Sequence, residues 1–73
     1  MIRRDFHGWT LDEALQEIHH IVGNVRKQSK VEQAEFITGN GEIKKQIIYL
    51  LQRYHLAPDN QWGNDGVVIV TIE

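Results

Sequence analysis

The sequence predicts one α/β domain, built as a two-layer sandwich in which two helices cover one face of a small mixed four-stranded sheet. Three observations support this fold class. The chain has 73 residues, which is the length of a single domain spanning residues 1–73. Two stretches repeat apolar residues at helical spacing, and each carries a single apolar stripe, so each helix covers one face of one sheet. Short strand-like segments alternate with these helices in the order βαβαββ, for which a two-layer sandwich is the most economical arrangement.

The first half of the chain is expected to form a strand, a helix and a second strand. Residues 2–6 form the first strand, and residues 10–13 match a capping box, in which a threonine and a glutamate each bond the backbone amide of the other. Apolar residues then recur at helical spacing until the polar run at residues 26–30, with fraying expected past residues 23–24. Residues 34–37 form the second strand, which stops at a glycine-rich breaker. The apolar stripe of this helix consists of Leu11, Ala14, Leu15, Ile18, Val22 and Val25.

The second half is expected to form another helix and two strands. The helix ends before Pro58, because a proline disfavours helical geometry in the residue that precedes it. A turn at residues 63–66 leads into the β-branched strand at residues 67–72, and a short third strand is expected within residues 57–62. The stripe of the second helix consists of Ile43, Ile47, Leu50, Leu51 and Tyr54. The residues predicted to be buried against the sheet are Leu15, Ile18, Val22, Ile47, Leu50 and Leu51.

The composition excludes several classes of protein. There are no cysteines, which excludes a disulfide framework and a thiolate zinc site. No stretch approaches the roughly 20 apolar residues of a membrane span, and no signal peptide is recognisable, so a cytoplasmic location without membrane contact is expected. The formal net charge of -2 counts mildly against a nucleic-acid partner. Short basic groups occur at residues 3–4, 26–30 and 44–45, and they favour such a partner only if they converge in space.

Two strand-to-helix loops are the candidates for a ligand site. The first loop contains Asp5 and His7, and the second contains Gly39 and Gly41. A helical crossover joins the two strands, so they should run parallel and end at the same edge of the sheet. Ligands of open α/β sheets bind at that edge. Each loop also leads into a helix N-terminus, where free amides favour anions, so together the loops are predicted to cradle a phosphate.

The residues Asp5 and His7 suggest two chemistries and one structural alternative. Their spacing places both side chains on one face of the strand end, where a carboxylate orients an imidazole or both groups hold a metal ion. An imidazole that titrates near neutrality is suited to general acid–base catalysis. In the structural alternative, Asp5 anchors loop amides, His7 is a polar strand end and the second loop is only a turn into a helix. The residues by themselves favour this alternative, because short motifs have little specificity.

The ordered set of motifs resembles the Smr (small MutS-related) domain family. Smr domains end their first strand with Leu-Asp-x-His-Gly, and this chain has Arg-Asp-Phe-His-Gly at residues 4–8. They open a helix with Thr-Leu-x-Glu-Ala, which matches residues 10–14, and end the second strand with Thr-Gly-x-Gly or His-Gly-x-Gly, which matches residues 38–41. Their last strand follows a glycine turn, as at residues 63–70. The resemblance extends over nearly the whole chain.

The resemblance implies a fold like the C-terminal domain of bacterial translation initiation factor three and endonuclease or nicking activity on DNA or RNA. It implies catalytic roles for Asp5 and His7. It leaves a divalent ion, Mg²⁺ or Mn²⁺, as an open alternative. The alternative function is a non-catalytic module that binds nucleic acid or a protein partner through the same edge. The residues expected to bind the nucleic-acid backbone are Arg4, Gly8, Thr38, Gly39, Asn40, Gly41 and Lys44.

Three departures from the family pattern bear on catalysis more than on fold. Arg4 stands where the family usually has leucine, which puts a cation beside Asp5. The second loop is about two residues shorter than the common form and runs directly into Glu42, which would repel a phosphate or help to hold a metal ion. The segment between residues 54 and 63 is compressed, so the third strand is expected to be vestigial.

Two tryptophans and a pair of histidines complete the set of conspicuous residues. Trp9 has two equal interpretations, a hydrophobic staple onto the first helical turn or a stacking platform for a base. Trp62 is expected to cover the small core. His19 and His20 point about 100° apart on a helix, so they should not share a metal ion and are expected to be exposed to solvent.

Overall fold

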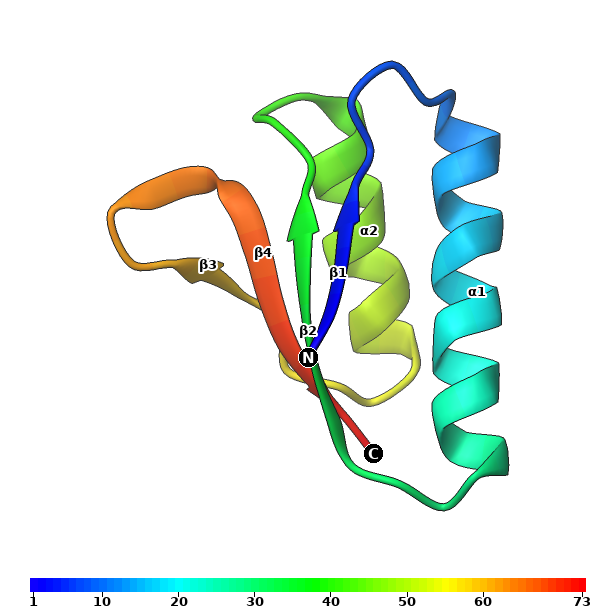
Figure 1. Ribbon diagram of the computed structural model, residues 1–73. Coiled ribbons are helices and arrows are strands. Elements are labelled where there is room, and N and C mark those ends of the chain that lie inside the picture. Colours follow the sequence, from blue (N-terminus) through cyan, green and yellow to red (C-terminus); the bar gives the residue numbers. More distant parts are fainter.

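The computed structural model describes all residues from 1 to 73 and confirms the order of elements and the α/β class (Figure 1). The strands lie in one sheet in the order β1-β2-β4-β3, with β1 and β2 parallel and β4 antiparallel to both of its neighbours. The elements are β1 (Ile2–Asp5), α1 (Leu11–Lys27), β2 (Glu32–Ile37), α2 (Glu42–Arg53), β3 (Asp59–Gln61) and β4 (Asn64–Ile72). No helix is both long enough and apolar enough to cross a membrane.

Helix α1 begins at the predicted capping box and ends at Lys27, within the polar run that was expected to end it. The Thr10 hydroxyl accepts the Glu13 amide at 3.2 Å, and the Glu13 carboxylate accepts the Thr10 amide at 2.9 Å. The fraying expected past residues 23–24 does not occur, and the helix is continuous to this end. Its last turn is held because Val25 is buried in the core and because Arg26 donates to the carbonyl oxygens of Tyr54 and Glu73.

The core lies between one face of the sheet and the two helices. Alternate residues of β4 enter it, namely Val68, Val70 and Ile72, while Ile69 and Thr71 point to the opposite, uncovered face. The predicted core residues Ile18, Val22, Ile47 and Leu51 are fully buried.

Leu15 and Leu50, which were predicted to be buried against the sheet, are less buried than the other four residues. Both are only partly buried and pack at the margin of the core. Ile21 is buried instead, because it lies one helical turn from Ile18 and Val25 on the side of α1 that faces the sheet.

The β3–β4 hairpin corrects the expected position of the last turn. The third strand exists, but β4 already begins at Asn64, so the turn consists of Trp62 and Gly63 rather than residues 63–66. Gly63 has a φ of 77°, a left-handed conformation that glycine adopts without steric cost. With the turn at this position, Trp62 stands at the hairpin tip and is 98% exposed. The prediction that Trp62 covers the core was therefore wrong.

Candidate functional site

The two strand-to-helix loops lie at the same edge of the sheet, as the parallel crossover predicted (Figure 1). Asp5 is paired with Ile37 at the ends of β1 and β2. One further bond, from the Phe6 amide to the Ile37 carbonyl oxygen at 2.9 Å, keeps the chains together as they leave the sheet. The loops therefore begin side by side. We refer to the end of the sheet formed by these two loops, residues 6–10 and 38–41, as the carboxyl edge.

The first loop is a tight turn held by Asp5. Its carboxylate accepts the backbone amide of His7 at 2.9 Å, and the Trp9 amide donates to the Phe6 carbonyl oxygen at 3.0 Å. Gly8 adopts a left-handed φ of 80°, which reverses the chain direction toward α1. The contact between Asp5 and His7 thus runs through the backbone and not through the imidazole. The structural interpretation of Asp5 as an anchor of loop amides is correct, and the exposed His7 is held by its main chain at the carboxyl edge.

The second loop is fixed to the beginning of β4. The amides of Thr38 and Gly39 both donate to the carbonyl oxygen of Gly66, at 2.9 and 3.1 Å. The Thr38 hydroxyl donates to the Gly39 carbonyl oxygen at 2.9 Å, and Gly39 has a φ of 69°. These two amides are already used within the protein, so they are not free to bind a phosphate. The first half of the loop sets its shape, and only the second half can offer amides to a ligand.

The N-termini of the two helices differ in how many backbone amides they leave without a hydrogen-bond partner. At α1 the Thr10 hydroxyl accepts the Glu13 amide, and the Glu13 carboxylate accepts the Thr10 amide. At α2 the N-cap is Gly41, and no side chain caps the helix. The first amides of α2 consequently lack protein partners and carry the partial positive charge of the helix dipole, a combination that favours an anion.

The predicted cations are distributed differently from what the sequence suggested. Arg4 binds the Glu17 carboxylate of α1 at 2.9 Å, and Arg3 lies 3.3 Å from the Glu35 carboxylate. In the register of β1 and β2, Arg4 lies opposite the buried Phe36, so its side chain points to the helix layer. The side chain of Asp5 points to the other face of the sheet. Arg4 therefore does not point toward the two loops that hold the other residues predicted to bind the nucleic-acid backbone.

Lys44 is the cation that the structure brings to the second loop. Its Nζ lies 3.5 Å from the Asn40 side-chain oxygen. The neighbouring Glu42 carboxylate accepts the side-chain amide of Gln46 at 2.7 Å, which turns it along α2 toward the next helical turn. Asn40, Gly41 and Lys44 are thus the part of the predicted backbone-binding set that surrounds the open end of α2.

The donor set does not fit a resident divalent ion. No three His, Cys, Asp or Glu side chains converge at any point of the chain. Asp5 is committed to the His7 amide, and Glu42 to Gln46. We therefore derive no chemistry through Mg²⁺ or Mn²⁺.

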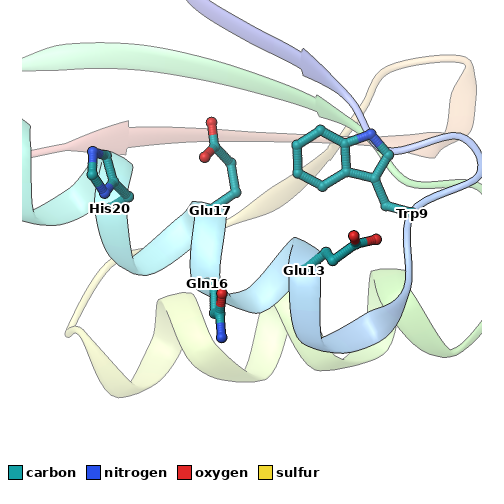
Figure 2. A pocket seen from close by; sticks show the side chains of 5 residues that line it. All are labelled: Trp9, Glu13, Gln16, Glu17 and His20. Atoms are coloured by element: carbon teal, nitrogen blue, oxygen red, sulfur yellow. The ribbon is translucent and has the colours of Figure 1, made fainter.

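Trp9 lines a shallow groove that the sequence did not suggest. The groove runs along the exposed side of α1 (Figure 2), and its walls are Trp9, Glu13, Gln16, Glu17 and His20. The indole packs edge-on against the Phe6 ring, with 5.0 Å between ring centroids and 86° between planes, and it remains 37% exposed. The edge-on contact with Phe6 makes Trp9 a cover over this corner of the core.

The histidines of α1 are exposed, as expected, but His19 has a partner that the sequence did not reveal. Its Nδ1 is hydrogen-bonded to the hydroxyl of Tyr54, which follows α2. The guanidinium of Arg26 lies 5.2 Å from the centre of the same ring. This cluster joins the two helices far from the carboxyl edge and has a structural role.

Comparison with known proteins identifies the family. The sequence model of the Smr domain matches residues 4–73. The chain belongs to the Smr domain family. Among solved structures it is similar to the Smr domain of Thermus thermophilus MutS2, with a TM-score of 0.75 and 22% sequence identity over 100% of this chain and 99% of the other. This likeness shows a common fold. No curated protein sequence is a significant match.

In this Smr domain the two motif loops combine structural and exposed residues. Asp5, Thr38 and Gly39 hold the loops in shape through bonds to backbone groups. His7 and Asn40 are exposed at the carboxyl edge, where a ligand can reach them.

Proposed function

We propose that this Smr domain binds the sugar–phosphate backbone of a nucleic acid at its carboxyl edge. The observation that carries the proposal is the convergence of the two motif loops at one sheet edge beside the uncapped N-terminus of α2. The amides of that helix and the Lys44 ammonium supply the positive potential. Gly8 and Gly41, which have open space where a side chain would be, let a backbone approach closely.

We further propose that the site cleaves phosphodiesters, with RNA as the easier substrate. His7 in its neutral form removes the proton from a ribose 2′-hydroxyl, and the 2′-oxygen bonds to phosphorus. The bond between phosphorus and the 5′-oxygen then breaks, and water protonates the departing oxygen. Amides of α2 and Lys44 stabilise the negative charge that builds on the phosphate. Asp5 acts here as a positioning residue, because it fixes the backbone of His7.

The second candidate function is nucleic-acid binding without cleavage. It is favoured by the commitment of the Asp5 carboxylate to a backbone amide instead of the His7 imidazole. The ion pairs of Arg3 and Arg4 and the net charge of -2 point to weak binding. Contacts to the backbone also carry little sequence information, so binding would show little sequence preference.

Cleavage and binding assays on the same protein separate the two candidates. Single-stranded RNA and plasmid DNA are incubated with wild type and with His7→Ala, each with and without Mn²⁺, and binding is measured in parallel at low salt. His7→Ala should abolish cleavage and leave binding nearly intact, since the imidazole moves a proton and adds little ground-state affinity. His20→Ala is the matched control, because it removes an exposed histidine from α1.

Three outcomes distinguish the candidates. Cleavage by wild type that persists in His7→Ala contradicts the assigned role of His7. Binding without any cleavage supports the second candidate. Wild-type protein that neither shifts nor cuts DNA or RNA at low salt contradicts the nucleic-acid function and leaves a protein-binding module.

A further inference from the structure

The tip of the β3–β4 hairpin carries a residue that the proposed function does not use. Trp62 is 98% exposed, so its indole contributes nothing to the core. Single exposed apolar residues are common on protein surfaces, and the placement and surroundings of this one must therefore decide whether it binds anything.

The hairpin lies at the same end of the sheet as the carboxyl edge. Strand β4 runs antiparallel to β2, so it begins where β2 ends, with Val67 opposite Ile37. Gly66 accepts the two amides of the second loop, and the hairpin continues beyond it to the pair formed by Asn64 and Gln61. Trp62 comes four residues before Gly66, at the turn of the hairpin and beyond the loop that Gly66 holds. Figure 1 shows this hairpin, in brown and orange, projecting to the side of the sheet near the end of β2.

The surroundings of Trp62 indicate what the indole can contact. Its sequence neighbours on the hairpin are polar, and Asp59 and Asp65 are both exposed there. Two carboxylates repel phosphate, so the hairpin is unsuited to the backbone of a nucleic acid. The flat indole is instead suited to bases, which stack on aromatic rings in a sequence-tolerant way. Asn60 also leaves an exposed side-chain amide on the hairpin, whereas the Asn64 side-chain oxygen accepts the Gly66 amide at 3.1 Å.

A protein partner is less well matched to this surface. Hot spots of protein interfaces are surrounded by further contacts that exclude water. No other large exposed hydrophobic residue lies on the hairpin tip; the others are Met1, Trp9, Val31, Tyr49 and Ile69. The indole is thus isolated among polar groups.

We propose that Trp62 stacks on an unpaired base of a strand whose backbone lies on the carboxyl edge, and that the domain therefore prefers single-stranded to duplex nucleic acid. The proposal rests on the proposed function for the position of the backbone. The faces of bases within a duplex are already covered by their neighbours, and only an unpaired base can present its face to the indole.

The test measures dissociation constants at low salt for a single-stranded RNA, an abasic strand of equal length and a duplex. Trp62→Ala should weaken binding of the single-stranded RNA about 5- to 150-fold, which corresponds to the ~1–3 kcal/mol of one base–aromatic stack. Binding of the abasic strand should not change, because it offers phosphates and no bases. Trp62→Phe should retain most of the affinity. Tyr49→Ala, which removes an exposed aromatic ring from α2, is the matched control and should behave like wild type.

Each contrary result has a distinct meaning. If Trp62→Ala binds the single-stranded RNA as tightly as wild type, the stacking role is overturned while the proposed function stands, and Trp62 becomes a candidate for protein docking. If wild type binds the duplex as tightly as the single strand, the preference is overturned. If wild type binds none of the three ligands, the proposed function fails and this inference fails with it. Unchanged circular dichroism and melting of Trp62→Ala exclude misfolding as the cause of any loss.

Discussion

The ion pair between Arg4 and Glu17 restrains a cation that would otherwise be available to a ligand. Its 2.9 Å contact fixes the guanidinium on the helix side of β1. Glu17→Gln removes the opposing charge and leaves the guanidinium held only by the Arg3 carbonyl oxygen at 2.9 Å, so that the long Arg4 side chain can reach a phosphate that lies near the end of β1. We expect this substitution to tighten nucleic-acid binding, because one more phosphate can be neutralised.

The size of this effect follows from counting phosphate contacts. With Arg3 and Arg4 paired to carboxylates, Lys44 is the main side-chain cation at the site. Each phosphate neutralised on a single strand contributes about −0.7 to the slope of log affinity against log salt. Wild type should therefore show a shallow slope of about −0.7 to −1.4, and Glu17→Gln a slope steeper by about 0.7. An exposed ion pair worth ~0.2–1 kcal/mol corresponds to an affinity gain of about 1.4- to 5-fold.

Fluorescence anisotropy with a labelled single-stranded RNA at several salt concentrations measures both quantities. Glu32→Gln is the matched control. It makes the same change in net charge at the start of β2, at the end of the sheet opposite the carboxyl edge. Equal effects of the two substitutions would show that only net charge matters. An unchanged slope for Glu17→Gln would show that the ion pair with Glu17 does not keep Arg4 from the ligand.

Two further predictions compare neighbouring residues of one type. Leu51→Ala should lower the free energy of unfolding by about 2–5 kcal/mol because Leu51 is fully buried. Leu50→Ala should cost roughly half as much because Leu50 is half-buried. Urea denaturation that ranks the two variants the other way would contradict the assigned helix face. Gly39→Ala should cost about 1–2 kcal/mol through its left-handed φ of 69°, and it should weaken RNA binding by distorting the loop. Gly41→Ala, with a φ of -98° and open space around the added methyl group, adds no left-handed strain and should cost less, its loss coming from the poorer N-cap preference of alanine; equal melting temperatures for the two variants would count against backbone strain at Gly39.

The sequence was sufficient to predict features that depend on local chemistry or on topology. The capping box at Thr10 and Glu13 involves residues three apart on one helix, so the pattern determines the contact. The shared edge of the two loops follows from the parallel crossover between β1 and β2.

Features that depend on long-range partners or on register were not predicted. Glu17 is thirteen residues from Arg4, and nothing in their spacing indicates that β1 and α1 bring them together. The amides of Thr38 and Gly39 are taken by Gly66, which is distant in the sequence. Trp62 was misplaced because the glycines at residues 63 and 66 both suit a turn, and a shift in strand register changes which way a side chain points.

We propose above that the carboxyl edge is the nucleic-acid interface of this domain. Titration of the ¹⁵N-labelled protein with a single-stranded RNA, followed by backbone amide chemical shifts, tests it residue by residue. We expect the largest shifts at Gly8, Asn40, Gly41 and Lys44, with little change in the loop from residue 28 to residue 31 at the opposite end of the sheet. Shifts confined to that opposite end, or no shifts at low salt and millimolar RNA, would contradict it.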